Sequence, residues 1–457
     1  MSRNASRVAL VVAALLAGTT GLTAQESTSR RLTLQDAITL ALKNNLSVRV
    51  AGTQISEAQG ARERQLAALL PHVTGDALAN LENRNLTVLG VNVPGLPTVV
   101  GPFAYYDFRL AANQRVIDRQ AYHNWKASQS QEQSTKLDYQ DARDLVIRQT
   151  AGFYLDAQSA LAEVQASESR VTTSEALEKL ARDEHDHGLA TAVDVVRAQV
   201  QLARDQQTLL VARDNYQTSL LVLARFLGLE PGAPFELAEQ LEFKHIELPD
   251  VGSAVHAAVE ARPDYKSLLS KRESLVEQQK ASHSRYYPTF SVSGDYGALG
   301  RNFASMPGIG EIQGTLSITV FDRDRNGEQK QLTGQLERLN DQMEDMARGI
   351  EEDIRKAALD LESAEQQVKV TEVALGLAQQ ELKLAGDRFR NGLTDNIEVV
   401  TAQDALAAAQ DDRIAALARH ADARAALTRA LGATEQNYQK YLGGSANQAA
   451  KDPLGGR

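Results

Sequence analysis

The chain has 457 residues and a formal net charge of −10, because 59 Asp and Glu outnumber 49 Lys and Arg. This acidic balance argues against nucleic acid as a partner, since surfaces that bind phosphate backbones are basic. The sequence contains no cysteine, which excludes disulfides, thiolate catalysis, Cys-ligated metal sites and a lipid anchor on an N-terminal cysteine.

Residues 1–24 have the pattern of a cleavable signal peptide. Arg3 and Arg7 precede an apolar run from Val8 to Leu16, and small residues lead to Ala24. The apolar run is too short for a transmembrane helix, which needs about 20 residues. We therefore expect the chain to be exported.

Residues 25–245 are predicted to begin with two helices and two strands. Apolar residues at helical spacing follow a potential cap at Thr33, and a second helical pattern ends at Pro71. After the proline the period changes to two, which indicates strands over about 72–85 and 104–117.

A long helical hairpin is predicted over residues 118–228. Its arms are rich in Ala, Gln, Glu and Leu, and Gly188-Leu189 lies at the break between them. The return arm is shorter than the outgoing arm by roughly the length of the helix that ends at Pro71, at about 1.5 Å per residue. We expect that helix to stack end to end on the return arm.

Residues 246–432 repeat this order, with strands over about 288–298 and 311–321 and a hairpin over 323–432. At an offset of 204 positions, without a gap, the tip at Gly392-Leu393 and its flanking residues match those of the first hairpin. The match predicts two tandem structural repeats. The remainder, residues 433–457, is predicted to be a flexible tail.

The four strands are each about as long as the 9–11 residues of a tilted membrane strand, and their polar and apolar residues alternate. A small soluble pair of hairpins is the alternative interpretation. In lipid, four strands cannot remain an open sheet, because the N–H and C=O groups at its edges would be unsatisfied. Membrane strands would therefore require closure by further copies of the chain.

Taken together, these features resemble the TolC-type outer-membrane efflux proteins, or outer-membrane factors. The resemblance spans about Leu32 to Gly432 and is carried by Leu32-Thr-Leu-Gln-Asp-Ala-Ile-Thr-Leu-Ala-Leu42, Ala-Ala-Leu-Leu-Pro71, Val-Ile-Asp118, Val-Phe-Asp322 and the paired tips. It implies a mainly α fold with four membrane β-strands. Three such chains would form one twelve-stranded β-barrel, continued by a long periplasmic α-helical barrel.

The resemblance also implies a function. The protein would be a homotrimer in outer-membrane lipid, serving as the exit duct of a tripartite efflux or type I secretion system. A periplasmic adaptor (membrane fusion protein) and an inner-membrane pump would be its partners. Such a channel is a passive conduit with a gated periplasmic mouth, and it is neither an enzyme nor dependent on a cofactor.

The resemblance places the gate near the hairpin tips. Thr401 stands where the family pattern has a second aspartate one turn after the position of Glu398, so a two-ring acidic constriction is in doubt. Asp395 lies three residues before Glu398, on the same helix face, and is a candidate substitute. Each acid can alternatively complement a helix N-terminus. The candidate gate residues are Asp194, Arg197, Asp395, Glu398 and Thr401. The candidate adaptor-docking residues are Gly188, Leu189, Gly392 and Leu393.

The sequence allows two other interpretations. Glu184-His-Asp-His187 contains potential metal ligands, but it lies at a hairpin tip and no third distant ligand is indicated, so we predict no metal site. A periplasmic coiled-coil adaptor or scaffold with a soluble β-domain is the alternative function. The repetition of strands and hairpin in both halves disfavours it.

Overall fold

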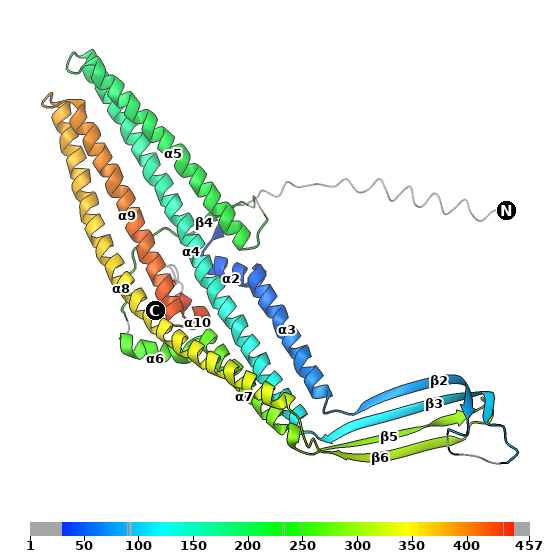
Figure 1. Cartoon of the computed structure of the whole chain (residues 1–457). Helices are drawn as coiled ribbons and strands as arrows, with labels where there is room; N and C mark the ends of the chain where they lie inside the picture. The colour runs from blue at the N-terminus through cyan, green and yellow to red at the C-terminus, as the bar shows by residue number, and fades with distance from the viewer. Residues whose placement is uncertain are drawn as a thin grey trace, which may run out of the picture.

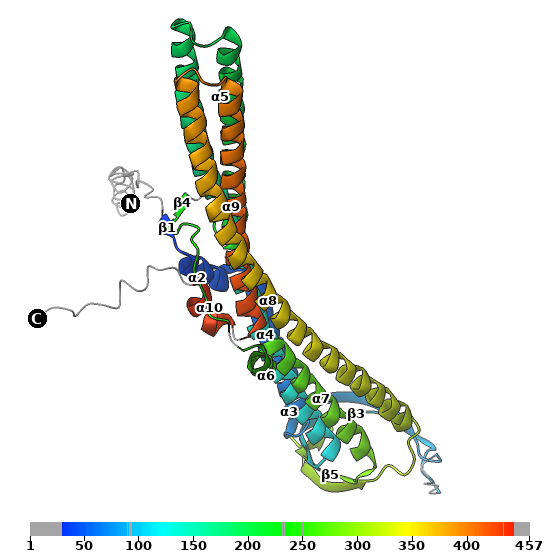
Figure 2. The same ribbon diagram turned by 90° about the vertical axis from the view of Figure 1, so that its left-hand side faces the viewer.

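The structure, a computed structural model, describes residues 30–442 except 89, 91–93, 231, 233, 249 and 433. The predicted signal peptide, residues 1–24, lies outside the described residues. The described chain is elongated: long helices lie side by side, a sheet extends from one end, and two helical hairpins reach the other (Figure 1, Figure 2). Among the described helices, none combines the length and hydrophobicity of a transmembrane segment.

The described chain is mostly helical, as predicted. Thr33 starts the first helix with a capping box, in which its hydroxyl accepts a hydrogen bond from Asp36 N at 3.1 Å and the Asp36 carboxylate accepts one from Thr33 N. From the N-terminus the elements are β1 (Arg30–Leu32), α2 (Leu34–Asn44), α3 (Leu46–Ala67), β2 (His72–Asn85), β3 (Val99–Ile117), α4 (Arg119–Asp186), α5 (Ala192–Phe226) and β4 (Phe235–Leu237).

The second half follows with further helices and strands. They are α6 (Val251–Ala261), α7 (Pro263–His283), the short 3-10 helix η1 (Ser284–Tyr286), β5 (Thr289–Gly300), β6 (Gly308–Ser317), α8 (Asp324–Arg390), α9 (Asn396–Ala430) and α10 (Thr434–Leu442). The two longest helices, α4 and α8, have 68 and 67 residues. Each therefore extends about 100 Å at 1.5 Å per residue.

One antiparallel sheet contains all four predicted strands, in the order β2-β3-β5-β6. Strands β2 and β6 lie at its edges and have no further partner strand within the described residues. Their outer N–H and C=O groups are therefore open to pairing with another chain. Strands β1 and β4 form a separate, short parallel pair.

Several strand boundaries differ from the prediction. Strand β6 ends at Ser317 rather than 321, because its ladder with β5 stops at the Thr289–Ser317 pair and the preceding Pro288 has no N–H to extend it. Strand β3 begins at Val99 rather than 104, because pairing with β2 resumes beyond a bulge. Alternation locates the strands but not their ends.

The sheet has one polar and one apolar face, as the period of two requires. The polar face carries His72, Asp76, Asp107, Arg109, Asp295, Glu311 and Gln313. The apolar face carries Val73, Phe108, Leu110, Tyr296, Ile312 and Leu316. In the single chain these apolar side chains are exposed, and Ile312 reaches 87%. An apolar sheet face of this kind needs lipid or protein to cover it.

The long hairpins form a helical layer in which α4 packs against both α5 and α9, and α9 also packs against α8. Helix α3 begins where α5 ends. Asn44 Nδ2 donates to Leu227 O at 3.3 Å, and Asn45 Nδ2 donates to Phe226 O at 3.2 Å. These bonds satisfy carbonyl groups at the end of α5. The end-to-end arrangement agrees with the helix lengths read from the sequence.

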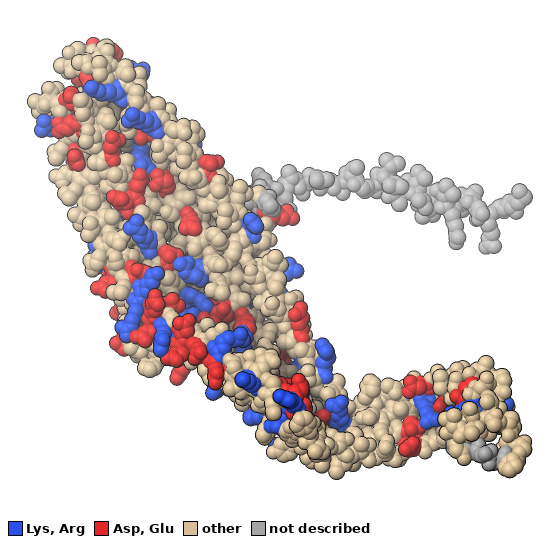
Figure 3. Space-filling model, viewed as in Figure 1, with Lys and Arg blue, Asp and Glu red and all other residues tan. Residues whose placement is uncertain are grey.

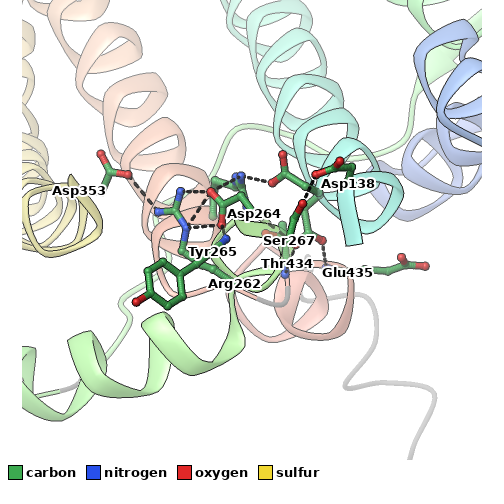
Figure 4. Close-up of polar contacts among 11 residues, drawn as sticks. Asp138, Arg262, Asp264, Tyr265, Ser267, Asp353, Thr434 and Glu435 are labelled. Carbon is green, nitrogen blue, oxygen red and sulfur yellow. Dashed lines mark hydrogen bonds and ion pairs between the residues drawn. The ribbon is translucent and has the colours of Figure 1, made fainter. Parts of the chain in front are cut away.

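In the second half, a charged network occupies the corresponding joint between α6, α7 and α9 (Figure 4). Arg262 donates to Asp264 of α7 and to Asp353 of α8, with Nη1 at 3.1 Å from Asp353 Oδ2. Arg429 of α9 lies 3.6 Å from the same Asp264 carboxylate. Burial opposes ionisation of Asp264, but the two arginines and the Tyr265 N–H lower its pKa. The network ties α7, α8 and α9 together at the point where α6 ends.

The prediction of a flexible tail from residue 433 is wrong for Thr434–Leu442, which form α10. The carboxylate of Asp144, on α4, accepts hydrogen bonds from Thr434 N at 3.3 Å and Glu435 N at 3.0 Å. These contacts satisfy the first N–H groups of the helix. Residues 443–457 lie outside the described residues.

Candidate functional site

The first hairpin tip turns between α4 and α5 at Gly188. Its φ of +74° is a left-handed conformation that glycine adopts without strain. Leu189 N and Ala190 N both donate to Glu184 O, at 2.8 and 3.2 Å, which closes the C-terminus of α4. The tip therefore presents Leu189 outward, and this side chain is 66% exposed.

Asp194 begins α5 as part of a capping box. Its carboxylate accepts hydrogen bonds from Thr191 N at 2.9 Å and Thr191 Oγ1 at 2.6 Å, and Arg197 Nη1 lies 3.6 Å away. Burial opposes ionisation of Asp194, but the Thr191 hydrogen bonds and the Arg197 charge lower its pKa. Only 6% of Asp194 is exposed, and its carboxylate is engaged as the cap of α5 and as the partner of Arg197.

The second tip turns at Gly392, where φ is +68°. Asp395 caps α9, since its Oδ1 accepts a hydrogen bond from Ile397 N at 3.1 Å. Glu398 accepts a hydrogen bond from the Thr394 hydroxyl, and its Oε1 lies 3.3 Å from Arg388 Nε of α8. Of Asp395 and Glu398, only Glu398 forms an ion pair with the other helix of its hairpin, α8.

Thr401 and Arg197 are exposed side chains on the second turns of α9 and α5. Thr401 Oγ1 donates to Ile397 O at 2.9 Å, a bond within its own helix. The structure therefore brings Asp194 and Arg197 together in one tip and places Asp395, Glu398 and Thr401 in the other.

Asn396, which sequence reasoning missed, links the two tips. Its Nδ2 donates to Asp194 O at 2.9 Å, and only 2% of the residue is exposed. Farther from the tips, Gln201 Nε2 lies 3.3 Å from Asp404 Oδ1. A small apolar cluster between the four helices includes Phe389 and Val399. The second hairpin is thus held against the first by buried polar contacts as well as by packing.

Within the described residues, no group of three His, Asp or Glu side chains is placed to hold a metal ion. His187 Nδ1 contacts Asp183 O at 2.6 Å instead of facing a carboxylate cluster. On the face shown in Figure 3, acidic and basic side chains are interspersed along the helices, while other residues cover most of the sheet.

The fold is that of solved outer-membrane channels. The outer membrane protein VceC from Vibrio cholerae superposes with a TM-score of 0.74 at 19% identity, over 87% of this chain and 96% of that chain. The CmeC outer membrane channel of Campylobacter jejuni gives a TM-score of 0.76 at 16% identity, over 90% and 89%. At 16–19% sequence identity, these structures show that the fold is shared and show nothing about function.

Relatives found by sequence are also named as outer membrane proteins. The toluene efflux pump outer membrane protein TtgC of Pseudomonas putida is 25% identical over 431 residues, which are 90% of this chain and 83% of that protein. The pyoverdine export outer membrane protein OpmQ of Pseudomonas aeruginosa is 20% identical over 421 residues, 90% and 87% of the two chains.

A family model described as outer membrane efflux protein matches residues 37–229 and 254–433. The two matched segments contain the long hairpins and the four-stranded sheet. The family consists of channels, which are passive conduits and not enzymes, so the match supports the channel over the periplasmic adaptor. The resemblance read from the sequence is confirmed, and the chain belongs to the outer membrane efflux protein family.

Proposed function

We propose that three copies of this chain form the outer-membrane exit duct of a tripartite efflux or type I secretion system. The observation that carries the proposal is the four-stranded sheet, with one apolar face and two unpaired edges, at the end of the long hairpins. A sheet cannot remain open in lipid, and four strands are too few to close alone. Three copies would provide twelve strands, an even number within the range of known barrels.

The polar face of the sheet would line the lumen of that barrel. Arg109 lies between two of its acids, with Nε 2.8 Å from Asp107 Oδ1 and Nη1 3.3 Å from Asp295 Oδ1. Asp76 and Glu311 lie on the same face. The lumen would therefore be acidic on balance, which favours cations over anions.

The helices would continue the barrel into the periplasm, and the tips would form its mouth. In this arrangement Glu398, with Asp395 and Thr401, supplies the polar groups of the second tip, and Asp194 with Arg197 supplies those of the first. Asn396 would hold the mouth closed by joining the two hairpins. The differing tips imply that the two tandem repeats, derived from one ancestral unit, have diverged at the gate.

The tips would also dock the periplasmic adaptor, through which the duct meets an inner-membrane pump. Leu189 and Leu393 support this role, because each is a large apolar side chain at least 66% exposed beside a turn glycine, Gly188 or Gly392. Relatives named for efflux and export support a transport duct as well. Residues 1–24 would direct the chain through the inner membrane as a cleaved signal.

Fractionation of cells tests the proposal. The mature chain should be recovered with the outer membrane, and crosslinking in mild detergent should give a single species of three chains. A periplasmic adaptor would behave differently, so recovery as a soluble monomer in periplasmic extract would refute the duct.

A further inference from the structure

The segment Leu241–Leu248, here called the strap, connects β4 to α6 along the side of the helical body (Figure 2). It forms no regular secondary structure and is attached through side chains. Leu241 packs against the cluster of Val368 and Leu417, on α8 and α9. Because the strap lacks a backbone ladder, a few side-chain contacts determine whether it stays in place.

The central contact of the strap is with His420. The Phe243 ring packs against the imidazole of His420, on α9, with 4.8 Å between ring centroids and 40° between the ring planes. His420 is 0% exposed, and among the described residues neither of its ring nitrogens has a hydrogen-bond partner. A buried polar group without a partner is unfavourable, and a buried charge without a partner is more so. The site therefore accommodates the neutral ring and rejects the imidazolium.

Charged groups around His420 strengthen this preference. On α9, Arg424 is buried and donates to Tyr441 O of α10 rather than to a carboxylate. Burial first, and then the charges of Arg424 and His245, lower the pKa of His420 to about 4, although Glu365 of α8 opposes them. Burial also lowers the pKa of Arg424, to about 10, so its guanidinium remains charged at neutral and acid pH.

The strap itself carries four further titratable groups: Glu242 and Glu247, which are exposed, and Lys244 and His245. Burial and the charge of Arg424 lower the pKa of Lys244. His245 Nδ1 lies 3.2 Å from both carboxylate oxygens of Glu365, which in turn pairs with Lys369 at 3.0 Å. Glu365 is therefore already engaged by two partners and is poorly placed to compensate a charge on His420.

We propose that the strap is an acid-released clamp: uncharged His420 seats Phe243 at neutral pH, and protonation of the buried imidazole expels it. Release would uncover the α8–α9 surface beneath Leu241–Leu248. The proposal rests only on contacts within one chain, and it would stand or fall independently of the duct.

The direction follows from linkage. In the released state His420 faces water and titrates near its ordinary value of about 6.5, whereas in the seated state the pKa is about 4. Between these values the released state binds a proton that the seated state does not. The equilibrium therefore shifts toward release as pH falls from about 6.5 to about 4, by up to roughly two orders of magnitude.

The absence of cysteine makes a direct test available. A nitroxide attached to Glu247→Cys, an exposed strap position, would be the only thiol label in the full mature chain. Its electron paramagnetic resonance spectrum is recorded in detergent from pH 7.5 to pH 4. The mobile fraction should rise at least tenfold on acidification, with the change reversed on return to neutral pH.

His420→Phe provides the decisive comparison, because it keeps a ring under Phe243 and removes the titrating group. The label should then remain immobile across the whole range. His256→Phe, at an exposed histidine of α6, should titrate like the wild type. If His420→Phe does not fold, His420→Leu serves the same purpose. A wild-type strap that stays immobile, or a His420 variant that still titrates like the wild type, would overturn the proposal.

Discussion

At the scale of residues, the two hairpin tips are alike in backbone and different in chemistry. Both turn at a glycine with positive φ and both begin the return helix with an aspartate or threonine cap. Asn396 has no counterpart, because the matching position 204 residues earlier is Ala192. The bond from Asn396 Nδ2 to Asp194 O therefore occurs once per chain, and it joins the two hairpins.

In the proposed duct, Asn396→Ala should loosen the periplasmic mouth. It removes one buried hydrogen bond and leaves Asp194 O without this donor, which costs about 1–2 kcal/mol and shifts an open–closed equilibrium by roughly tenfold. Conductance of single channels in planar bilayers measures the fraction of time spent open. Asn391→Ala is the matched control, since this exposed amide donates only within its own hairpin, to Asp387 O. Equal behaviour of the two variants would remove Asn396 from the gate.

The sequence predicted the turns at Gly188 and Gly392 because their chemistry is local. It also left open whether the neighbouring acids cap helices, and Asp194 and Asp395 both do. It could not assign Asn396, whose partner lies 202 positions away in the chain. The only available signal was the mismatch between Asn396 and Ala192 in an otherwise matching pair of tips.

At the scale of elements, length decides what could be predicted. The long arms α4 and α8 contain enough residues for a helical pattern to be unmistakable, whereas α10 has nine residues. Helices that short are marginal alone and depend on tertiary contacts. Here the contacts come from α4, where Asp144 caps α10 and Arg143 Nε donates to Glu435 Oε2 at 2.7 Å. Neither contact is visible in the local sequence.

Truncation tests the contribution of α10. A chain that ends at Gly432 loses the packing of Tyr441 and Leu442 and leaves Arg424 without the carbonyl to which it donates. We expect a loss of about 2–5 kcal/mol, measured as a lower midpoint of thermal unfolding. A chain that ends at Leu442 keeps α10 and should unfold at the wild-type temperature. Equal midpoints for the two truncations would mean that α10 is dispensable.

At the scale of the whole molecule, the two faces of the sheet must meet different surroundings. Ile312 and Gln313 are neighbours on β6, so their side chains point to opposite faces. Ile312 would face lipid and Gln313 the lumen. Alternation alone places the two side chains on opposite faces of the sheet. The difference between lipid and lumen arises only when the proposed barrel is closed.

Ile312→Lys should impair assembly, because a charge on the lipid face of a membrane strand costs about 2–4 kcal/mol near the middle of the bilayer. Gln313→Lys introduces the same charged side chain one position away, on the polar face, and should be tolerated. The yield of trimer extracted from outer membranes compares them. If Gln313→Lys is the more damaging variant, the orientation of the sheet is the reverse of the one proposed.

The unpaired edges of β2 and β6 also determine how such an assembly can grow. Joining two copies pairs one edge of each but leaves two edges open, the same number that a single copy has. Only the last copy, which closes the ring, removes them both. The first junction forms one strand interface, whereas the copy that closes a ring of three forms two at once, so partial rings should be minor species beside the closed ring. Until the ring closes, each free subunit has two edge strands with unpaired N–H and C=O groups. These edges can pair with other proteins, so the free subunit is prone to aggregation.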